Sequence, residues 1–156
     1  MKTELIVVGK TDNPHFIAGI EDYVRRICHY VPFSIAVIPE LKNNKNRGAE
    51  QQKVQEGRLI LKKIEAADTV VLLDEHGKEF RSVELASWME KKQQSVRKLV
   101  FVIGGPYGFS PEVYARANEK ISLSKLTFSH QMVRLIFVEQ LYRACTILKG
   151  EPYHHE

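Results

Sequence analysis

Short apolar runs alternate along this chain with longer segments in which apolar residues recur at helical spacing. The short runs predict buried β-strands at residues 5–8, 33–38, 69–73, 99–103 and 121–123. The longer segments predict helices at residues 14–27, 49–66, 83–93, a short one from 111, and 132–148. Alternating strands and helices favour a parallel sheet, and strands that are apolar on both faces need helices on both sides. The pattern therefore predicts an α/β fold: one domain with a mostly parallel sheet covered by helices on both faces.

Proline follows a potential capping residue at two of the expected helix starts. Asn13-Pro14 opens the first helix and Ser110-Pro111 opens the short one, and both pairs are typical of a capped N-terminus. The polar residues and glycine of Asp74-Glu75-His76-Gly77 predict a turn after the third strand. We therefore expect that strand to end at Leu73.

The composition is that of a single soluble domain covering residues 1–156. The chain has 156 residues, of which 44% are hydrophobic and 27% charged, and these values are ordinary for a globular protein. The net charge of +4 and the isoelectric point near 9.0 are compatible with nucleic-acid binding but do not establish it.

The sequence indicates neither a membrane nor an oxidising compartment. The N-terminal apolar run is too short for a signal peptide, and no segment approaches the length of a membrane span. Cys28 and Cys145 each lie in an apolar helical pattern and form no Cys-x-x-Cys pair, which predicts buried free thiols. We therefore expect a cytoplasmic protein with no membrane partner.

A glycine-rich turn follows the fourth expected strand. Gly104-Gly105-Pro106-Tyr107-Gly108 lacks the ending of a phosphate-binding P-loop and does not match the dinucleotide motif Gly-x-Gly-x-x-Gly. Ligands bind beyond the carboxyl ends of strands in open α/β sheets, and glycine lets a ligand approach the backbone. The turn therefore indicates a small-molecule site, with a plain strand-to-helix turn as the alternative.

The end of the chain supplies further candidate chemistry. The segment at 123–128 mixes apolar and polar residues, and by itself it is compatible with a strand and its exit loop. The tail at 151–156 contains Tyr153 and His154 and is too polar to belong to the core. The sequence therefore suggests a site built from loops, with aromatic and imidazole groups supplied by the terminus.

The last helix carries more apolar residues than one stripe against a core requires. A homodimer interface is the simplest cover for the surplus, and complete burial within one domain is the alternative. Arg134 and Arg143 lie on the same helix and need partners, which could be RNA phosphates, carboxylates or a neighbouring subunit.

No metal site is expected. His76, His130, His154 and His155 have no companions at metal-ligand spacing, and sequence order alone assigns no catalytic triad or Cys-His pair. The basic loop at 42–48 could contact phosphates, and a solvated loop is the alternative.

Several segments together indicate a protein family more specifically than any one of them does. They are Val7–Lys10, Leu72–Glu75 with Gly77-Lys78, Phe101–Pro106, Leu123–Phe128, His130, Val133-Arg134, Glu139–Ala144 and Pro152–His154. In these segments the chain resembles the bacterial large-subunit rRNA pseudouridine N3-methyltransferases, small members of the SPOUT superfamily. The resemblance spans most of the chain.

The resemblance implies a C-terminal trefoil knot, a homodimer and S-adenosylmethionine as methyl donor. It implies that the enzyme methylates N3 of a pseudouridine in 23S rRNA and acts on assembled ribosomes. It places the cofactor at Leu73, Gly104, Leu123, Ser124, Lys125, Leu126, Thr127 and Phe128. S-adenosylmethionine carries no phosphate, so the lack of phosphate-binding motifs agrees with this cofactor.

The tail and the last helix supply the candidate catalytic residues. His154 is the first candidate for the base that removes the N3 proton, since imidazole titrates near neutral pH. Arg143 could stabilise the resulting anion, and Tyr153 could stack on or hydrogen-bond a flipped base. The alternatives are that these residues only hold RNA, or that the protein is a non-enzymatic ribosome-associated RNA-binding protein.

Overall fold

The computed structural model describes residues 1–41 and 47–156 of the chain. Strands and helices alternate along it, with bounds close to those the sequence predicts. In chain order they are β1 (Lys2–Val8), α1 (Pro14–Ile27), β2 (Phe33–Ile38), α2 (Ala49–Lys62), β3 (Thr69–Glu79), α3 (Ser82–Ser95), β4 (Lys98–Ile103), α4 (Pro111–Arg116), β5 (Glu119–Ser122) and α5 (Met132–Leu148).

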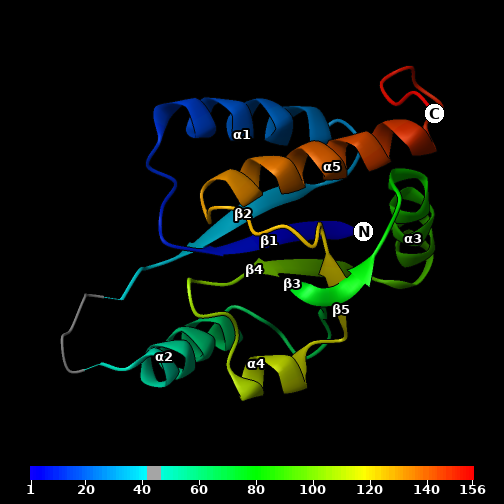
Figure 1. The fold of residues 1–156 in the computed structure, drawn as a ribbon. Coiled ribbons are helices and arrows are strands. Elements are labelled where there is room, and N and C mark those ends of the chain that lie inside the picture. The colour runs from blue at the N-terminus through cyan, green and yellow to red at the C-terminus, as the bar shows by residue number, and fades with distance from the viewer. Residues whose placement is uncertain (42–46) are drawn as a thin grey trace.

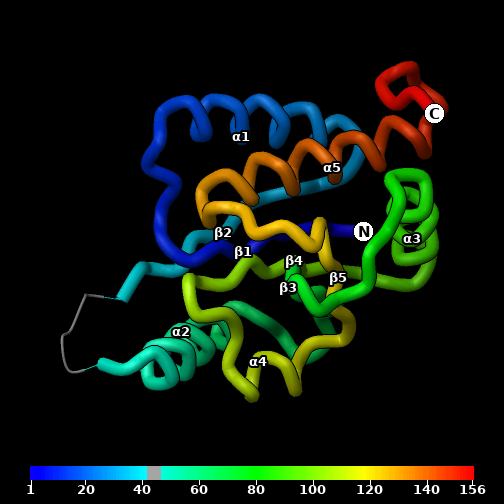
Figure 2. The backbone as a smooth tube through the Cα atoms, in the orientation of Figure 1, coloured from blue at the N-terminus to red at the C-terminus, as the bar shows by residue number. Residues whose placement is uncertain are grey.

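The strands form one sheet in the order β2-β1-β4-β3-β5, and neighbouring strands pair in parallel throughout. Helices α1, α3 and α5 lie on one face of the sheet, and α2 and α4 lie on the other (Figure 1). The tube view traces the crossover connections that this arrangement requires (Figure 2). The predicted α/β architecture, with helices on both faces, is therefore confirmed.

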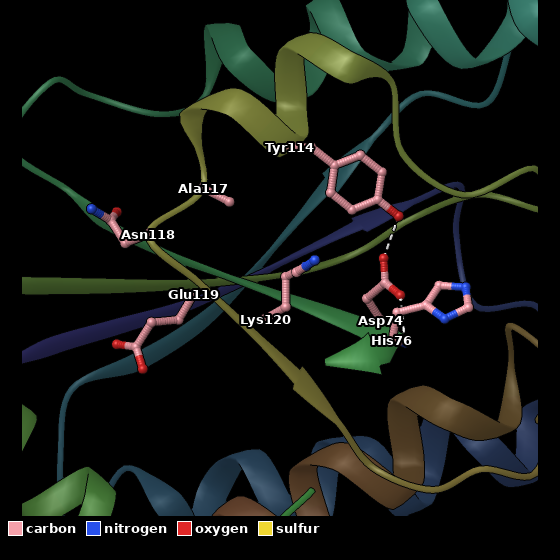
Figure 3. A pocket seen from close by; sticks show the side chains of 7 residues that line it. All are labelled: Asp74, His76, Tyr114, Ala117, Asn118, Glu119 and Lys120. Carbon is pink, nitrogen blue, oxygen red and sulfur yellow. Dashed lines mark hydrogen bonds between the residues drawn. The ribbon is translucent and has the colours of Figure 1, made fainter. Parts of the chain in front are cut away.

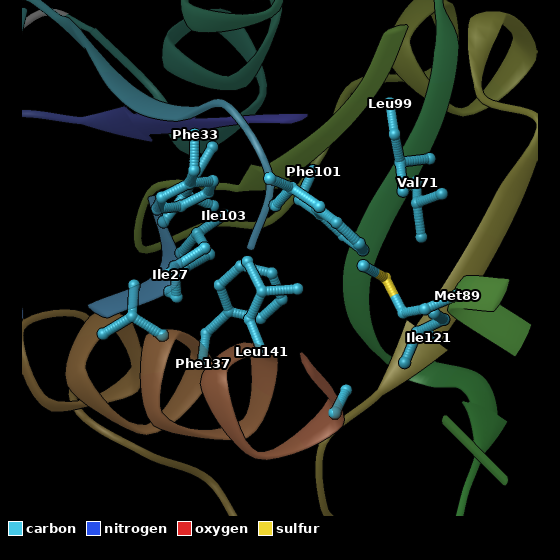
Figure 4. Packing of buried hydrophobic residues seen from close by; sticks show 14 of the residues in the cluster. Ile27, Phe33, Val71, Met89, Leu99, Phe101, Ile103, Ile121, Phe137 and Leu141 are labelled. Carbon is cyan, nitrogen blue, oxygen red and sulfur yellow. The ribbon is translucent and has the colours of Figure 1, made fainter. Parts of the chain in front are cut away.

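Each face of the sheet buries its own hydrophobic cluster. Under α1, α3 and α5 the ring of Phe101 packs against that of Phe137, with centroids 4.8 Å apart, and Met89 closes the cluster from α3 (Figure 4). On the other face, Ile60 of α2 and Val113 of α4 cover alternate residues of the same strands. A continuously apolar strand such as β4 is thus buried on both sides, as its sequence predicts.

The predicted caps form at two helix starts. The side chain of Asn13 accepts a hydrogen bond from the backbone N–H of His15, and that of Ser110 accepts one from the N–H of Val113. Both helices carry proline in the first turn. These local signals therefore fix where α1 and α4 begin.

The predicted turn at residues 74–77 is wrong. Strand β3 continues to Glu79, and its pairing with β5 shifts register between Leu73 and Lys78. A Cβ on Gly77 would lie 2.6 Å from the backbone nitrogen of Ile121, so only glycine lets the chain pass so close to β5. The polar residues mark an irregularity within a strand instead of its end.

Helix α5 lies between α1 and α3 on the sheet (Figure 1). Partly buried residues on its flanks, among them Leu135 and Tyr142, join the cluster below it. Met132 is the exposed large hydrophobic residue on α5 in the described part of the chain, at 38%. Burial within one chain therefore accounts for most of the apolar surplus that suggested a dimer.

The remaining expectations concern the cysteines, the basic loop, the membrane and metal binding. Both cysteines are free, and Cys145 is buried, but Cys28 is exposed because it caps the C-terminus of α1. Most of the basic loop, at 42–46, lies outside the described residues. Within 1–41 and 47–156, no helix is long and apolar enough to cross a membrane, and no cluster of three or more potential metal ligands occurs.

Candidate functional site

A cavity of about 700 Å³ opens beside the irregularity in the middle of β3 and the carboxyl ends of β4 and β5. This volume is in the range of small-molecule sites. Seven of the eight residues assigned to the cofactor from the sequence line it, and they come from three separate parts of the chain: Leu73, Gly104, Leu123, Ser124, Leu126, Thr127 and Phe128. The carboxyl edge of the sheet thus brings these residues together.

The eighth residue, Lys125, does not line the cavity. Its side chain is 85% exposed, and its ammonium group lies 3.9 Å from the carboxylate of Glu79. The chain turns tightly here, since the backbone N–H of Leu126 donates to the hydroxyl of Ser124 at 2.9 Å. That turn points Lys125 outward while its neighbours face the cavity.

The glycine turn forms one wall of the cavity. The N–H of Gly108 donates to the carbonyl of Gly105 at 3.2 Å and closes the turn, with φ of +82° at Gly108. A Cβ on Gly104 would lie 3.0 Å from the ring of Phe109, which also lines the cavity. A larger residue at position 104 must therefore displace this ring.

Exposed apolar side chains gather at the mouth of the cavity. Leu126 is 75% exposed, Tyr107 52% and Tyr114 39%, and all three line the opening. Exposed apolar patches of this kind mark binding surfaces. The mouth therefore suits a ligand with flat or apolar groups.

A second hollow of about 450 Å³ adjoins the first and shares Asp74, His76 and Tyr114 with it (Figure 3). The hydroxyl of Tyr114 donates to Asp74, whose other carboxylate oxygen accepts from the backbone N–H of His76 at 2.8 Å. Burial and this carboxylate raise the pKa of Tyr114 to about 12. Tyr114 is therefore a phenol at neutral pH and acts as a hydrogen-bond donor.

The candidate catalytic residues lie together at the C-terminal end of α5. Arg143 donates to Glu139 at 2.6 Å and to Nδ1 of His154 at 3.0 Å, and its guanidinium lies 4.8 Å from the ring centroid of Tyr153. The hydroxyl of Tyr153 donates to Glu139 at 3.0 Å and lies 3.1 Å from that of Tyr23. We call these five residues the tail cluster.

The tail cluster fixes the protonation of two of its members. Burial raises the pKa of Tyr153, and the bonds to Tyr23 and Glu139 raise it further, so the phenol keeps its proton. A guanidinium can only donate, so Nδ1 of His154 accepts and the neutral ring carries its proton on Nε2. The contact with Arg143 therefore occupies Nδ1 of His154.

The tail cluster does not meet the cavity of its own chain. Val133, near the start of α5, lines the cavity, whereas Arg143 is ten residues further along the helix. A helix rises 1.5 Å per residue, so the two positions are about 15 Å apart along the axis. The structure therefore brings the candidate catalytic residues together but separates them from the candidate cofactor residues.

Arg134 has partners that sequence reasoning did not consider. Its guanidinium is buried and donates to the backbone carbonyls of Val8 and Gly9 and to the hydroxyl of Thr11. It joins the end of β1 to the start of α5 and is not an RNA contact.

Sequence reasoning also missed residues that help to shape the cavity. Asp74 directly follows the buried part of β3, and its place at the carboxyl edge is a signal that could have revealed it. His130, in the loop before α5, also lines the cavity, and the family resemblance had already singled it out without giving it a role. Tyr114 reaches the cavity from α4 without any comparable signal, so only the packing identifies it.

The comparisons with known proteins agree along the whole chain. Residues 1–154 match the family described as "Predicted SPOUT methyltransferase". The chain is 65% identical to a protein of Phocaeicola vulgatus, 62% to one of Bacteroides thetaiotaomicron and 54% to one of Flavobacterium johnsoniae, in each case over 100% of both chains. Each of these relatives is named ribosomal RNA large subunit methyltransferase H. Such similarity favours an enzyme over a non-enzymatic RNA-binding protein, and the chain belongs to the SPOUT methyltransferase family.

Proposed function

We propose that this protein transfers a methyl group from S-adenosylmethionine to N3 of a pseudouridine in 23S rRNA, and that it acts on assembled ribosomes. The observation that carries the proposal is the cavity beside the irregularity of β3 and the carboxyl ends of β4 and β5, lined by a glycine turn and the 122–128 loop. The name that the relatives share and the net charge of +4 support RNA of the large ribosomal subunit as substrate.

The residues of the cavity fit S-adenosylmethionine. The turn at 104–108 and the loop after β5 expose backbone groups, and Leu73, Leu123 and Phe128 offer apolar walls for an adenine ring. When bound, the cofactor supplies an activated methyl group on a sulfonium. The protein then has to hold this group and the target nitrogen in line and to keep water out, which is catalysis by orientation.

We assign the tail cluster to the substrate base. The target nitrogen loses its N3 proton as the new nitrogen–carbon bond forms, and His154 accepts that proton once it has left Arg143. Arg143 is then free to stabilise the negative charge that develops on the imide. Tyr153 offers an aromatic face to a flipped base.

We also propose that the working enzyme is a homodimer with a C-terminal trefoil knot. The knot is supported by membership of the family. The dimer is supported by the separation of the tail cluster from the cavity of the same chain, because the tail of a second copy can complete a site that its own cannot reach.

The proposal is tested by methylation and binding assays on the unmodified protein. Calorimetry should show one S-adenosylmethionine site per chain. With labelled cofactor, methyl transfer should be strong to whole ribosomes lacking the modification and weak to naked 23S rRNA or free nucleoside. Sedimentation at micromolar concentration should give twice the chain mass. Transfer to free nucleoside at the ribosomal rate, or to a protein instead of RNA, would contradict the assignment of the substrate.

A further inference from the structure

A buried carboxylate lies against the glycine turn without lining the cavity. Glu56 of α2 is only 3% exposed, and it does not line the cavity. Buried carboxylates are rare because the loss of hydration is costly unless hydrogen bonds replace it. Gln52, one turn earlier on the helix, donates to this carboxylate at 3.2 Å. The position of Glu56 therefore requires further partners.

The other partner is the turn itself. The carboxylate of Glu56 lies against the backbone of Gly105; burial raises the pKa of this carboxyl, and the nearby N–H of Gly105 opposes that shift. The approach is so close that a Cβ on Gly105 would lie 2.8 Å from Oε2 and closer still to Oε1. The carbonyl of Gly105 meanwhile accepts the bond from Gly108 that closes the turn. Glu56 thus contacts Gly105, the residue whose carbonyl accepts the bond that closes the turn.

The next residue of α2 contacts the far end of the same loop. A Cβ on Gly57 would lie 3.2 Å from Cβ of Ser110 and 3.2 Å from Val113. Ser110 is buried, and its hydroxyl caps α4. Two consecutive residues of one helix therefore fix both ends of the loop 104–110, which carries a wall of the cavity.

We propose that Glu56 is a positioning residue of the methyl-transfer site, whose carboxylate sets the conformation of the Gly105 turn and so the affinity for the cofactor. The proposal rests on the proposed function. Burial raises the pKa of the Glu56 carboxyl, and the groups of Gln52 and Gly105 that face it oppose this shift, because a carboxylate accepts hydrogen bonds more strongly than the neutral acid. Glu56 acts from outside the cavity and touches neither cofactor nor RNA.

The proposal predicts a loss of cofactor affinity that is separate from any loss of stability. In calorimetry, Glu56→Ala should weaken S-adenosylmethionine binding by about tenfold, and Glu56→Gln, which keeps one acceptor oxygen, should recover most of it. The KM for the cofactor should rise while the KM for ribosomes stays the same. Ile60→Val is the matched control, because Ile60 is buried on the same helix and its side chain offers the turn no hydrogen-bond acceptor. It should lower the melting temperature and leave cofactor binding unchanged.

A double-mutant cycle tests the same proposal if Glu56→Ala folds poorly. Gly105→Ala places a methyl group against the carboxylate, so it should weaken cofactor binding much less when Glu56 is also alanine. Parent affinity in Glu56→Ala, or strictly additive effects in the cycle, would overturn the positioning role. Failure of the unmodified protein to bind the cofactor would instead reject the proposed function, and this inference with it.

Discussion

The two ends of α5 differ in how the chain prepares them for function. At the start of the helix, the cavity has a fixed frame, with a closed glycine turn and an open, partly apolar mouth. At the end of the helix, the polar groups of the tail cluster already bond to one another. The first region is ready to bind a ligand, whereas the second must give up internal bonds before it can act. The region we propose for cofactor binding and the region we propose for proton removal are therefore organised separately in this chain.

Loss of the tail should have the largest effect on methyl transfer and should sharpen the contrast between the two ends of α5. A chain ending at Pro152 should lose ribosome methylation by several orders of magnitude, because base recognition and proton removal disappear together. His154→Ala alone should lower the rate of ribosome methylation by about 10²–10⁴-fold if the imidazole is the general base. Single-turnover rates across pH measure both effects. S-adenosylmethionine affinity should stay near the parent value in each variant, and a parental rate in His154→Ala would eliminate the base role.

A mixing experiment tests whether the two regions meet across a dimer. At a cofactor concentration well below the Kd of Gly104→Val, His154→Ala and Gly104→Val should each keep about a tenth of the parent activity or less, since one lacks the tail function and the other binds the cofactor at least tenfold more weakly. Random exchange of subunits in an equal mixture should restore about a quarter of the parent activity, because half of the dimers then hold one intact site. Activity that stays at the level of the separate variants would show that the tail serves its own chain.

The cavity alone is probed by Gly104→Val. The new side chain has to displace the ring of Phe109, so cofactor affinity should fall at least tenfold, about 1.4 kcal/mol. Gly48→Val is the control, because a Cβ on Gly48 meets nothing within 4 Å. Calorimetry compares the two, and equal affinities would remove the turn from the site.

The smallest expected effect is on stability at high pH, and it concerns Tyr114, which lines both hollows. Its pKa is raised from 10.0 to about 12, so the folded chain holds this proton more tightly than the unfolded chain. Stability should therefore decline as pH rises from about 10 through about 12. Tyr114→Phe should flatten part of that decline in urea titrations. An unchanged pH dependence would contradict the bond to Asp74.

Predictions from the sequence were correct where a feature depends on residues that are close together in the chain. The apolar runs predicted the strands, and Asn13-Pro14 and Ser110-Pro111 predicted the starts of α1 and α4. It failed at residues 74–77, because a polar, glycine-containing segment can be a turn or a strand irregularity. The proximity of β5 decides between the two.

The sequence by itself thus determined the architecture of alternating strands and helices, the family, and seven of the residues that line the cavity. Burial of apolar strands and helix capping act over a few residues, and these forces leave a readable pattern. Only the tertiary structure decided that Lys125 faces outward, that Arg134 bonds to β1, and that Glu56 supports the glycine turn. These contacts join residues far apart in the chain, and hydrophobic periodicity carries no information about which polar groups the fold brings together.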